Sequence, residues 1–291
     1  MPWNSHTNTT KIAVIYLNNQ LMRKTLLLTF ICGLLIAFGT SFTFKQSEKK
    51  FLQKKGFEFV PSGTTTIDGE SVSIQGFYML ESEVSNLAYR EFLNDLEKNG
   101  KTEALAIAAV AADKWLLPNM QMDVMVENYH TNVAYNAYPV VNISQEGARL
   151  YCRWLEEKFA EQGYSLKVRI PEMAEWIYAA KGGNETNMYA WEGNSLRNKK
   201  GAYLANFKTE KTGDDGGYIT AITKSYFPNA FGLYNMCGNV SEWVNDTAMS
   251  QGGNWWSDAE FLKIATKQEF GNSTGPSPFI GFRPVITATV Y

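Results

Sequence analysis

The feature that most constrains this fold is a long stretch without helical or strand periodicity in the C-terminal part of the chain. After position 183, roughly 100 residues rich in Gly, Asn, Trp and Tyr follow, with only short apolar runs among them. Such a stretch is uncommon inside a compact domain, because few backbone ladders are available to hold it. We therefore expect a loop-rich half that something else stabilises, and a bound metal ion is the first candidate.

The preceding part of the chain carries periodic segments. Short β-type runs punctuated by glycine occupy 57–80, and Ser85 is placed to cap a helix. Segment 119–138 has no clear period and is expected to be a surface loop. The expected helices begin at Ser85, Thr102, Ser144 and Pro171, the second of them spanning 102–117. Together these segments predict one α+β domain, in which small helices pack on a small, irregular sheet.

Charge and histidine content exclude two classes of function. The chain has 27 Lys and Arg against 29 Asp and Glu, a net charge of −2, whereas a nucleic-acid-binding surface needs clustered positive charge. Its 2 histidines leave little for a histidine-rich metal site. Aromatic residues make up 14% of the chain, which is typical of a folded protein and not of a disordered one. We expect no nucleic-acid partner.

The N-terminal segment has the features of an export signal. Residues 25–44 form an uncharged, mostly apolar run directly after Arg23 and Lys24, as in secretory signals. The run is also about long enough to span a bilayer as an uncleaved anchor. We assign 22–45 to a signal peptide or membrane anchor. The expected location is the periplasm, or the outer membrane and cell envelope, with membrane attachment through this segment if it is not cleaved.

The remaining boundaries follow from this assignment. Residues 1–21 are an N-terminal extension ahead of Met22, which is a natural start for the signal. The charged segment 46–55 is expected to be a linker, and 56–291 is the folded domain.

The cysteines give little sign of covalent cross-linking. Cys32 lies in the middle of the apolar run, which is a poor site for lipid attachment. Cys152 falls inside an expected helix and Cys237 inside a tight turn, and buried free thiols are common in such places. We expect two free thiols in the domain and no bridge between them.

An ordered set of motifs resembles the formylglycine-generating-enzyme, or sulfatase-modifying-factor, family. The most specific string is FGLYNMCGNVSEWVND at 231–246, and the resemblance covers 57–285 in family order. The other motifs are PVVNIS at 139–144, RIPEMAEWIYAAKGG at 169–183, GGNWW at 252–256 and GFRPV at 281–285. The resemblance implies a variant of the C-type-lectin-like fold, with little regular structure and with structural calcium.

The resemblance also implies two calcium sites, each with an alternative. The first comprises Asn235, Gly238, Val240 and Glu242, whose side chains and carbonyls supply the oxygen ligands that calcium prefers. The alternative is a tight turn in which Glu242 forms a salt bridge, for example with Arg283. The second site is composed of Asn206, Phe207, Asp215 and Gly217. Its alternative is a solvated turn, because D-G and G-G dipeptides usually mark turns.

The family's catalytic cysteines are missing. Family members bind copper(I), a soft metal that selects thiolates, with two cysteines just after the GGNWW-type turn. Ser257 and Leu262 occupy these positions, so we expect no copper and no formylglycine-generating oxidase activity. Glu172, Glu175 and Asp258 are carboxylates without a convincing catalytic pattern.

The leading hypothesis is an exported, non-catalytic member of the family, a structural or protein-interaction component of the bacterial cell envelope. Catalytically inactive relatives in gliding motility and type IX secretion suggest an envelope or secretion-system partner. The alternatives are an enzyme of unknown chemistry on the same fold and a lectin-like protein that stacks a sugar on Trp256. Partner docking is expected in the aromatic-rich segment 243–280. Trp243 and Trp255 are expected to be core residues. The aromatic residues of this segment are Trp243, Trp255, Trp256, Phe261, Phe270 and Phe279.

Overall fold

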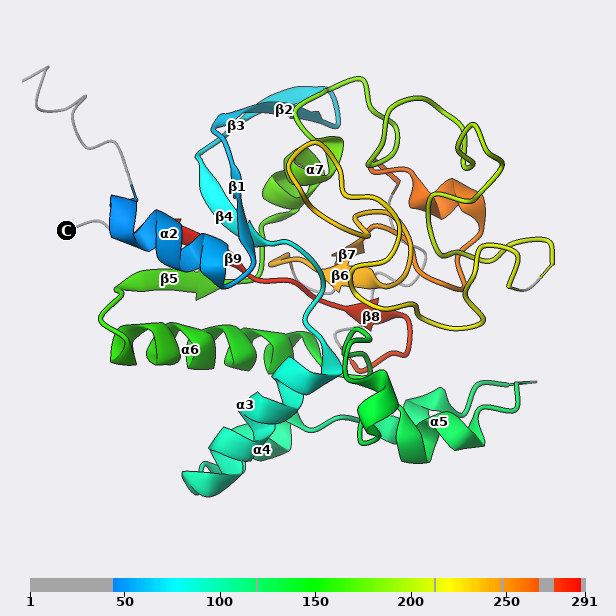
Figure 1. Cartoon of the computed structure of the whole chain (residues 1–291). Coiled ribbons are helices and arrows are strands. Elements are labelled where there is room, and N and C mark those ends of the chain that lie inside the picture. Colours follow the sequence, from blue (N-terminus) through cyan, green and yellow to red (C-terminus); the bar gives the residue numbers. More distant parts are fainter. Residues whose placement is uncertain (1–43, 119, 212, 247–248, 267–274, 289–291) are drawn as a thin grey trace, which may run out of the picture. The chain divides into compact units, whose positions relative to one another are not determined.

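A four-stranded antiparallel sheet lies at the centre of the computed structural model of this chain (Figure 1). The last described strand lies between two strands from earlier in the chain, with Ile286 opposite both Tyr78 and Val168. The beginning and the end of the domain are therefore held together by backbone pairing. The strand order is β1 (Phe57–Val60), β4 (Phe77–Leu80), β9 (Val285–Ala288) and β5 (Leu166–Arg169).

Both faces of this sheet are buried. Successive strand residues point to opposite faces, so Tyr78 and Ile286 join one apolar cluster while Phe77 and Met79 join another. The first cluster includes residues of α6 (Gln145–Glu161), and the second includes residues of α7 (Met173–Lys181). Figure 1 shows these two helices on opposite sides of the strands. The expected α+β class, with helices packed on a small sheet, is confirmed.

Serine caps place the helix starts as expected. The Ser85 hydroxyl accepts a hydrogen bond from the Ala88 amide (3.3 Å) at the start of α3 (Asn86–Lys98). The Ser144 hydroxyl accepts one from the Gly147 amide (3.0 Å) at the start of α6. Such caps satisfy amide groups that have no partner within the helix.

Two expected elements have different extents in the structure. The predicted helix over 102–117 is split into α4 (Thr102–Ala108) and the 3₁₀-helix η1 (Ala112–Trp115). The predicted loop over 119–138 contains α5 (Asp123–Asn128) and the 3₁₀-helix η2 (Val133–Tyr135). These helices have between 3 and 7 residues each, which is too few for a clear periodic pattern.

Segment 46–55, expected to be a linker, contains the helix α2 (Gln46–Lys54). Leu52 is fully buried, and the Phe51 ring stacks on Tyr164 with centroids 3.9 Å apart. The two apolar residues of α2 are adjacent in sequence and flanked by polar and charged residues, so the segment shows no helical period in its hydrophobicity. Tertiary packing, and not helix propensity, holds this helix in place.

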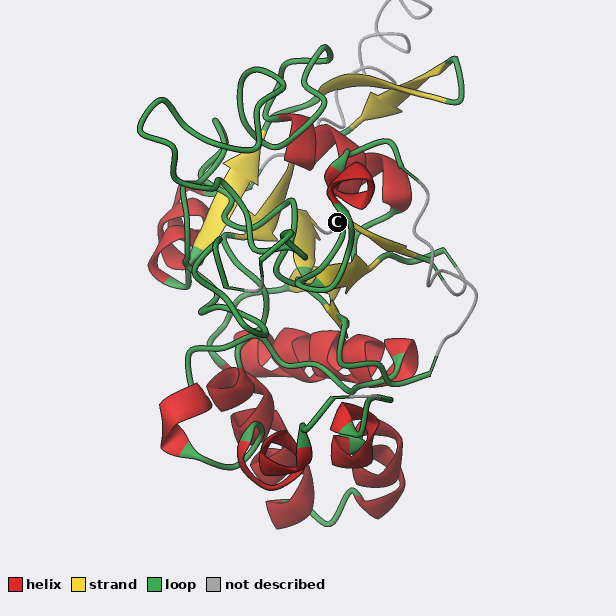
Figure 2. Ribbon diagram, turned by 90° about the vertical axis from the view of Figure 1, so that its right-hand side faces the viewer, coloured by secondary structure: helices red, strands yellow, loops and turns green. Residues whose placement is uncertain are grey.

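The predicted loop-rich half of the chain contains little regular secondary structure, as expected. Between α7 and β6 (Ser241–Trp243), the described residues form no helix and no named strand. Asparagine side chains replace ladders there: the Asn229 carboxamide oxygen, for example, accepts hydrogen bonds from the Phe231 and Leu233 amides. Figure 2 shows these loops gathered on the side of the strands opposite to α6.

The remaining strands form two small sheets. In the first, β2 (Gly63–Ile67) and β3 (Glu70–Ile74) form an antiparallel hairpin. In the second, β6 lies in the centre, antiparallel to β7 (Ser250–Gln251) and parallel to β8 (Ile280–Gly281). The 3₁₀-helix η3 (Ala259–Leu262) comes between β7 and β8 in the sequence.

The structure describes residues 44–118, 120–211, 213–246, 249–266 and 275–288, and these fall in one compact unit, Phe44–Thr289. The expected export segment 25–44, apart from its last residue, and the extension 1–21 lie outside the described residues. None of the helices in the described ranges combines the length and apolar character needed to cross a bilayer. Cys152 and Cys237 are both buried and free, as expected.

Candidate functional site

The first predicted calcium-ligand set lies on a tight turn between the loop region and β6. Asn235 has a φ of 51°, Gly238 of 82° and Asn239 of 64°, so three residues of this turn adopt the left-handed region. Glycine is required at 238, because a Cβ there would lie 2.4 Å from the Asn206 carbonyl oxygen. The turn therefore packs directly on the segment that carries the second predicted set.

Glu242 does not point into this turn as a free ligand. Its Oε1 accepts a hydrogen bond from Arg283 Nη2 (2.6 Å), and its Oε2 accepts from Arg283 Nε (2.7 Å) and Trp176 Nε1 (2.9 Å). Both side chains of this ion pair are almost fully buried. The carboxylate charge is already neutralised, so the geometry matches the salt-bridge alternative and does not fit a calcium ligand. Val240 is buried in the apolar cluster beside Trp115 and Trp255.

Asn235 is turned toward a different carboxylate, that of Glu83. Asn235 Nδ2 donates to Glu83 Oε2 (3.2 Å), and Asn239 Nδ2 donates to Glu83 Oε1 (2.8 Å). Asn235 also donates to the Thr223 carbonyl (3.1 Å). These bonds tie the turn to the segment that follows β4 and to the loop over 221–223.

Glu83 is a central residue that sequence reasoning missed. It is completely buried, and desolvation raises its pKa to about 8, although the nearby Arg283 guanidinium acts in the opposite direction. Its partners lie more than 150 positions away in the sequence. The available signal was its place between an apolar strand and the capped start of α3, where the chain has little room to reach solvent.

The second predicted set is brought together. Asp215 Oδ2 accepts a hydrogen bond from the Phe207 amide (2.8 Å), and Asp215 Oδ1 accepts one from the Gly217 amide (3.2 Å). The carboxylate is mostly buried, and burial is the main cause of its raised pKa. The described residues place no cationic side chain in a salt bridge with it.

Asn206 supplies the observation that fits a cation here. Its Nδ2 donates to the Ile219 carbonyl (2.8 Å) and to Asn239 Oδ1 (3.1 Å), whereas its buried Oδ1 accepts no hydrogen bond from the residues that the structure describes. That oxygen lies 2.7 Å from the place where a side chain at Gly217 would begin. A buried acceptor without a donor costs free energy, and a calcium ion would satisfy it together with the Asp215 carboxylate.

A site of this kind would depend on neutral oxygens as well as on one carboxylate. In the described part of the chain, no group of three His, Cys, Asp or Glu side chains is arranged to hold a metal ion. Calcium accepts amide and carbonyl oxygens readily. The donor set of Asn206, Phe207, Asp215 and Gly217 is therefore chemically compatible with calcium.

The positions of the missing cysteines are closed. The Ser257 side chain is buried, and its hydroxyl accepts a hydrogen bond from the Asn254 amide (3.1 Å). Leu262 is fully buried in the apolar cluster that covers one face of the central sheet. Cys237 is also buried, and desolvation raises the pKa of its thiol to about 12, which disfavours the thiolate that binds soft metals.

The three candidate carboxylates have structural partners. Glu175 forms two hydrogen bonds of 2.7 Å with the Arg169 guanidinium at the start of α7. Glu172, the residue before that helix, accepts a hydrogen bond from Asn245 Nδ2 (2.7 Å). Asp258 is exposed and lies 3.2 Å from Lys208 Nζ. Glu172 and Glu175 form the capping box of α7, in which the Glu172 amide donates to Glu175 Oε2 (2.9 Å). In the described structure no hydrogen bond joins the side chains of two of these carboxylates, so they do not form an acid–base pair.

The aromatic-rich segment over 243–280 is mainly interior. Trp243 and Trp255 are buried, as expected for core residues, and Phe270 lies outside the described residues. Trp256, Phe261 and Phe279 are partly exposed. Among the described residues, the proposed docking surface is thus smaller than the sequence suggested, and Trp256 lines a large cavity.

The family model and the similar relatives that were compared point to the same protein family. Residues 42–288 match the family described as Sulfatase-modifying factor enzyme 1-like domain. The formylglycine-generating enzyme of Mus musculus is 31% identical over 235 residues, which cover 68% of this chain and 58% of that protein. The inactive C-alpha-formylglycine-generating enzyme 2 of Bos taurus is 28% identical over 132 residues, 42% of this chain and 40% of that protein. The chain thus spans less than two thirds of the length of these relatives.

A solved structure shares the fold. The crystal structure of CarF superimposes with a TM-score of 0.55 at 19% sequence identity, covering 80% of this chain and 98% of that one. At this identity the likeness concerns the fold alone.

Proposed function

Because this chain belongs to the sulfatase-modifying factor enzyme 1-like family, we propose that it is a non-catalytic member that acts through binding. Its role is that of a structural or protein-interaction component of the bacterial cell envelope. The observation that carries the proposal is the state of the two catalytic-cysteine positions. Ser257 is buried and hydrogen-bonded, and Leu262 is part of the core.

The ligand chemistry supports the loss of oxidase activity. A serine hydroxyl is a hard, weakly acidic ligand, and leucine has no donor atom, whereas copper(I) selects soft sulfur ligands. Similarity to a relative named as inactive is in keeping with this proposal.

Export and an envelope partner form the second part of the proposal. It is supported by the apolar run over 25–44 that follows Arg23 and Lys24. Gliding motility and type IX secretion are the envelope processes that we propose for it, with a secretion-system or other envelope protein as the partner.

Calcium has a structural role in this proposal. Asn206 and Asp215 would hold the ion by side-chain oxygens, with Phe207 and Gly217 contributing carbonyls. Bound calcium would supply the positive charge that the buried Asp215 carboxylate lacks. The Glu242 set does not fit an ion, because Arg283 already neutralises that carboxylate.

The proposed absence of oxidase activity is tested with the purified chain, a cysteine peptide of the sulfatase type, added copper and oxygen. We expect no formylglycine product by mass spectrometry, while the Mus musculus relative, run in parallel, gives product. A Ser257→Cys/Leu262→Cys double variant is the matched control, because it restores both sulfur positions. Product from the unaltered chain would overturn the proposal.

Export is tested with a reporter fused to the C-terminus of the full chain and of a chain lacking 25–44. We expect the full chain in the envelope fraction and the shortened chain in the cytoplasm. Equal envelope location of both fusions would refute the assignment. Affinity purification of the full fusion from solubilised envelopes, compared with the shortened one, then tests for a specific envelope partner.

A further inference from the structure

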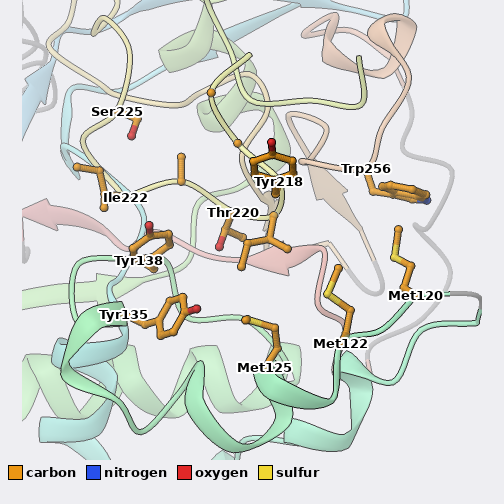
Figure 3. Close-up of a pocket in the computed structure, with 14 residues that line it drawn as sticks. Met120, Met122, Met125, Tyr135, Tyr138, Tyr218, Thr220, Ile222, Ser225 and Trp256 are labelled. Atoms are coloured by element: carbon orange, nitrogen blue, oxygen red, sulfur yellow. The ribbon is translucent and has the colours of Figure 1, made fainter. Parts of the chain in front are cut away.

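A cavity of about 830 Å³ lies beside the second predicted calcium loop (Figure 3). Methionines from the α5 region form one wall, and residues of the loop over 216–225 form the other. Figure 3 shows the Met120, Met122 and Met125 side chains on the same side of the cavity, with Trp256 close to Met120. The lining residues are Met120, Met122, Met125, Tyr135, Tyr138, Gly216, Gly217, Tyr218, Ile219, Thr220, Ala221, Ile222, Ser225 and Trp256.

The lining carries no charge. No Asp, Glu, Lys, Arg or His is among its residues, and no Asn or Gln either. Burying an unpaired charge is costly, so the lining selects against ions. A sugar is also a poor occupant, because its many hydroxyl groups would leave water without carboxylate or carboxamide partners. The cavity therefore disfavours the sugar-stacking alternative for Trp256.

The lining is suited to an aromatic ring. Methionine thioethers make favourable contacts with aromatic rings and adapt to their shape. The Tyr135 and Tyr138 rings meet edge to face, with centroids 5.2 Å apart, and so present both a face and an edge. Tyr218, which is 75% exposed, stands at the opening.

The deeper polar groups are already satisfied. Thr220 Oγ1 is hydrogen-bonded to the Tyr129 hydroxyl (2.7 Å), and the Ile219 carbonyl accepts from Asn206. Ser225 and the tyrosines add hydroxyl groups, enough to orient a ligand with a few polar atoms. A cavity volume of roughly 300–1,000 Å³ is typical of small-molecule sites, and the volume of this cavity falls within that range.

We propose that this cavity is a binding site for a small, uncharged molecule that contains an aromatic ring. The site is separate from the positions of Ser257 and Leu262, which do not line it. The proposal therefore stands independently of whether the chain is catalytic.

The test uses the full chain and four probes in calorimetric or ligand-observed NMR titrations. N-acetyl-L-tryptophanamide is the neutral aromatic probe, and N-acetyl-L-tryptophan carries the same ring with a negative charge. N-acetyl-L-leucinamide is neutral without a ring, and methyl α-glucoside is a sugar. We expect the neutral aromatic probe to bind at least about tenfold more tightly than each of the others.

A pair of variants locates the binding. Met122→Lys introduces a charge into the cavity wall and is expected to weaken binding of N-acetyl-L-tryptophanamide by about tenfold or more. Met188→Lys makes the same change at an exposed methionine outside the cavity and is expected to leave binding unchanged. Ser225→Trp, which fills the cavity, provides a second blocking variant if Met122→Lys fails to fold.

Three results would overturn the proposal. One is the absence of binding by the neutral aromatic probe up to about 10 mM. Another is equal or tighter binding of the glucoside, of the charged probe or of N-acetyl-L-leucinamide. The third is unchanged binding in folded Met122→Lys and Ser225→Trp proteins, because the probe would then occupy another place.

Discussion

Arg283 connects three separate parts of the chain through one buried guanidinium. It pairs with both oxygens of Glu242 and donates to the carbonyls of Glu81 (3.3 Å) and Tyr234 (2.7 Å). The end of β4, the turn before β6 and the segment before β9 thus share one cation. Breaking a buried ion pair by removing one partner typically costs about 3–5 kcal/mol, because the other charge is left uncompensated.

Glu242→Ala is therefore expected to lower the free energy of unfolding by about 3–5 kcal/mol. Glu242→Gln, which keeps one acceptor but no charge, should lie between this variant and the parent. Thermal melts in EDTA and in millimolar calcium measure the effect. The salt-bridge geometry predicts the same loss in both buffers. A loss present only with calcium would instead make Glu242 a ligand.

Glu83 is expected to make stability fall as the pH rises. Its pKa is about 8 in the folded chain, against an ordinary value of 4.5 in the unfolded chain. Between these values the folded state retains a proton that the unfolded state has released, so the free energy of unfolding decreases with rising pH. The decrease begins near pH 4.5 and ends above about pH 8.

Glu83→Gln isolates this effect, because glutamine resembles the protonated acid at every pH. Subtracting the melting curves of this variant from those of the parent, from pH 5 to 9, removes the contribution of other groups. We expect the parent to lose stability relative to the variant as the pH rises. A parent that is more stable than the variant by a constant amount would show that Arg283 keeps Glu83 ionised.

Among the elements, those with a local signal were predictable from the sequence. Ser85 and Ser144 act within three residues of themselves, and both helices begin where their patterns indicated. The helix over 46–54 was missed, since Leu52 and Phe51 are stabilised by contacts with distant residues. Sequence distance also explains which contacts of the candidate site could be predicted. Phe207 and Asp215 are close in sequence and are joined by a hydrogen bond within the predicted set, whereas the partners of Glu83 come from remote loops.

The loop that joins Asn206 to Gly217 is the element whose stability we propose to depend on calcium. A ligand that binds only the folded state stabilises it by about 2.7 kcal/mol at a hundredfold excess over its Kd. We expect calcium to raise the melting temperature of the parent after exhaustive chelation. Asp215→Ala should abolish most of that rise, because it removes the one charged ligand.

Asp214→Ala is the matched control for this experiment. Asp214 is the exposed neighbour in the same loop, and within the described residues its side chain accepts no hydrogen bond that closes the loop. The control should keep the calcium-dependent rise. Indifference of the parent to calcium would mean that the loop over 206–217 is held by its hydrogen bonds alone.

For the molecule as a whole, the folded unit begins earlier than the sequence suggested. The family match covers 42–288, and Phe44 already belongs to the apolar cluster under the central sheet. Its ring meets Tyr78 edge to face, with centroids 4.8 Å apart. β9 pairs with β4 and β5, so both ends of the described domain pack on the same sheet. The charged helix α2 thus contributes Leu52 to the core of the domain, although its sequence pattern did not predict a helix.

Two truncated chains test this boundary. A chain starting at Phe44 retains α2, and a chain starting at Gly56 lacks it. Removing α2 exposes the surface covered by Leu52 and Phe51, and each large apolar side chain contributes roughly 1.5–3 kcal/mol when buried. Loss of these residues and Phe44 should therefore cost about 4 kcal/mol or more, which lowers the melting temperature by roughly 10 °C in a domain of this size.

Leu52→Ala in the full chain separates packing from chain length. This substitution removes one buried side chain without shortening the protein, and it should cost about 2–5 kcal/mol. Lys50→Ala, on the exposed side of the same helix, should change stability by less than about 0.5 kcal/mol. If the two truncated chains and Leu52→Ala all melt with the parent, the segment over 46–55 is the linker that its charge pattern first indicated. A large loss for Leu52→Ala and for the shorter chain together would place α2 within the cooperative folding unit.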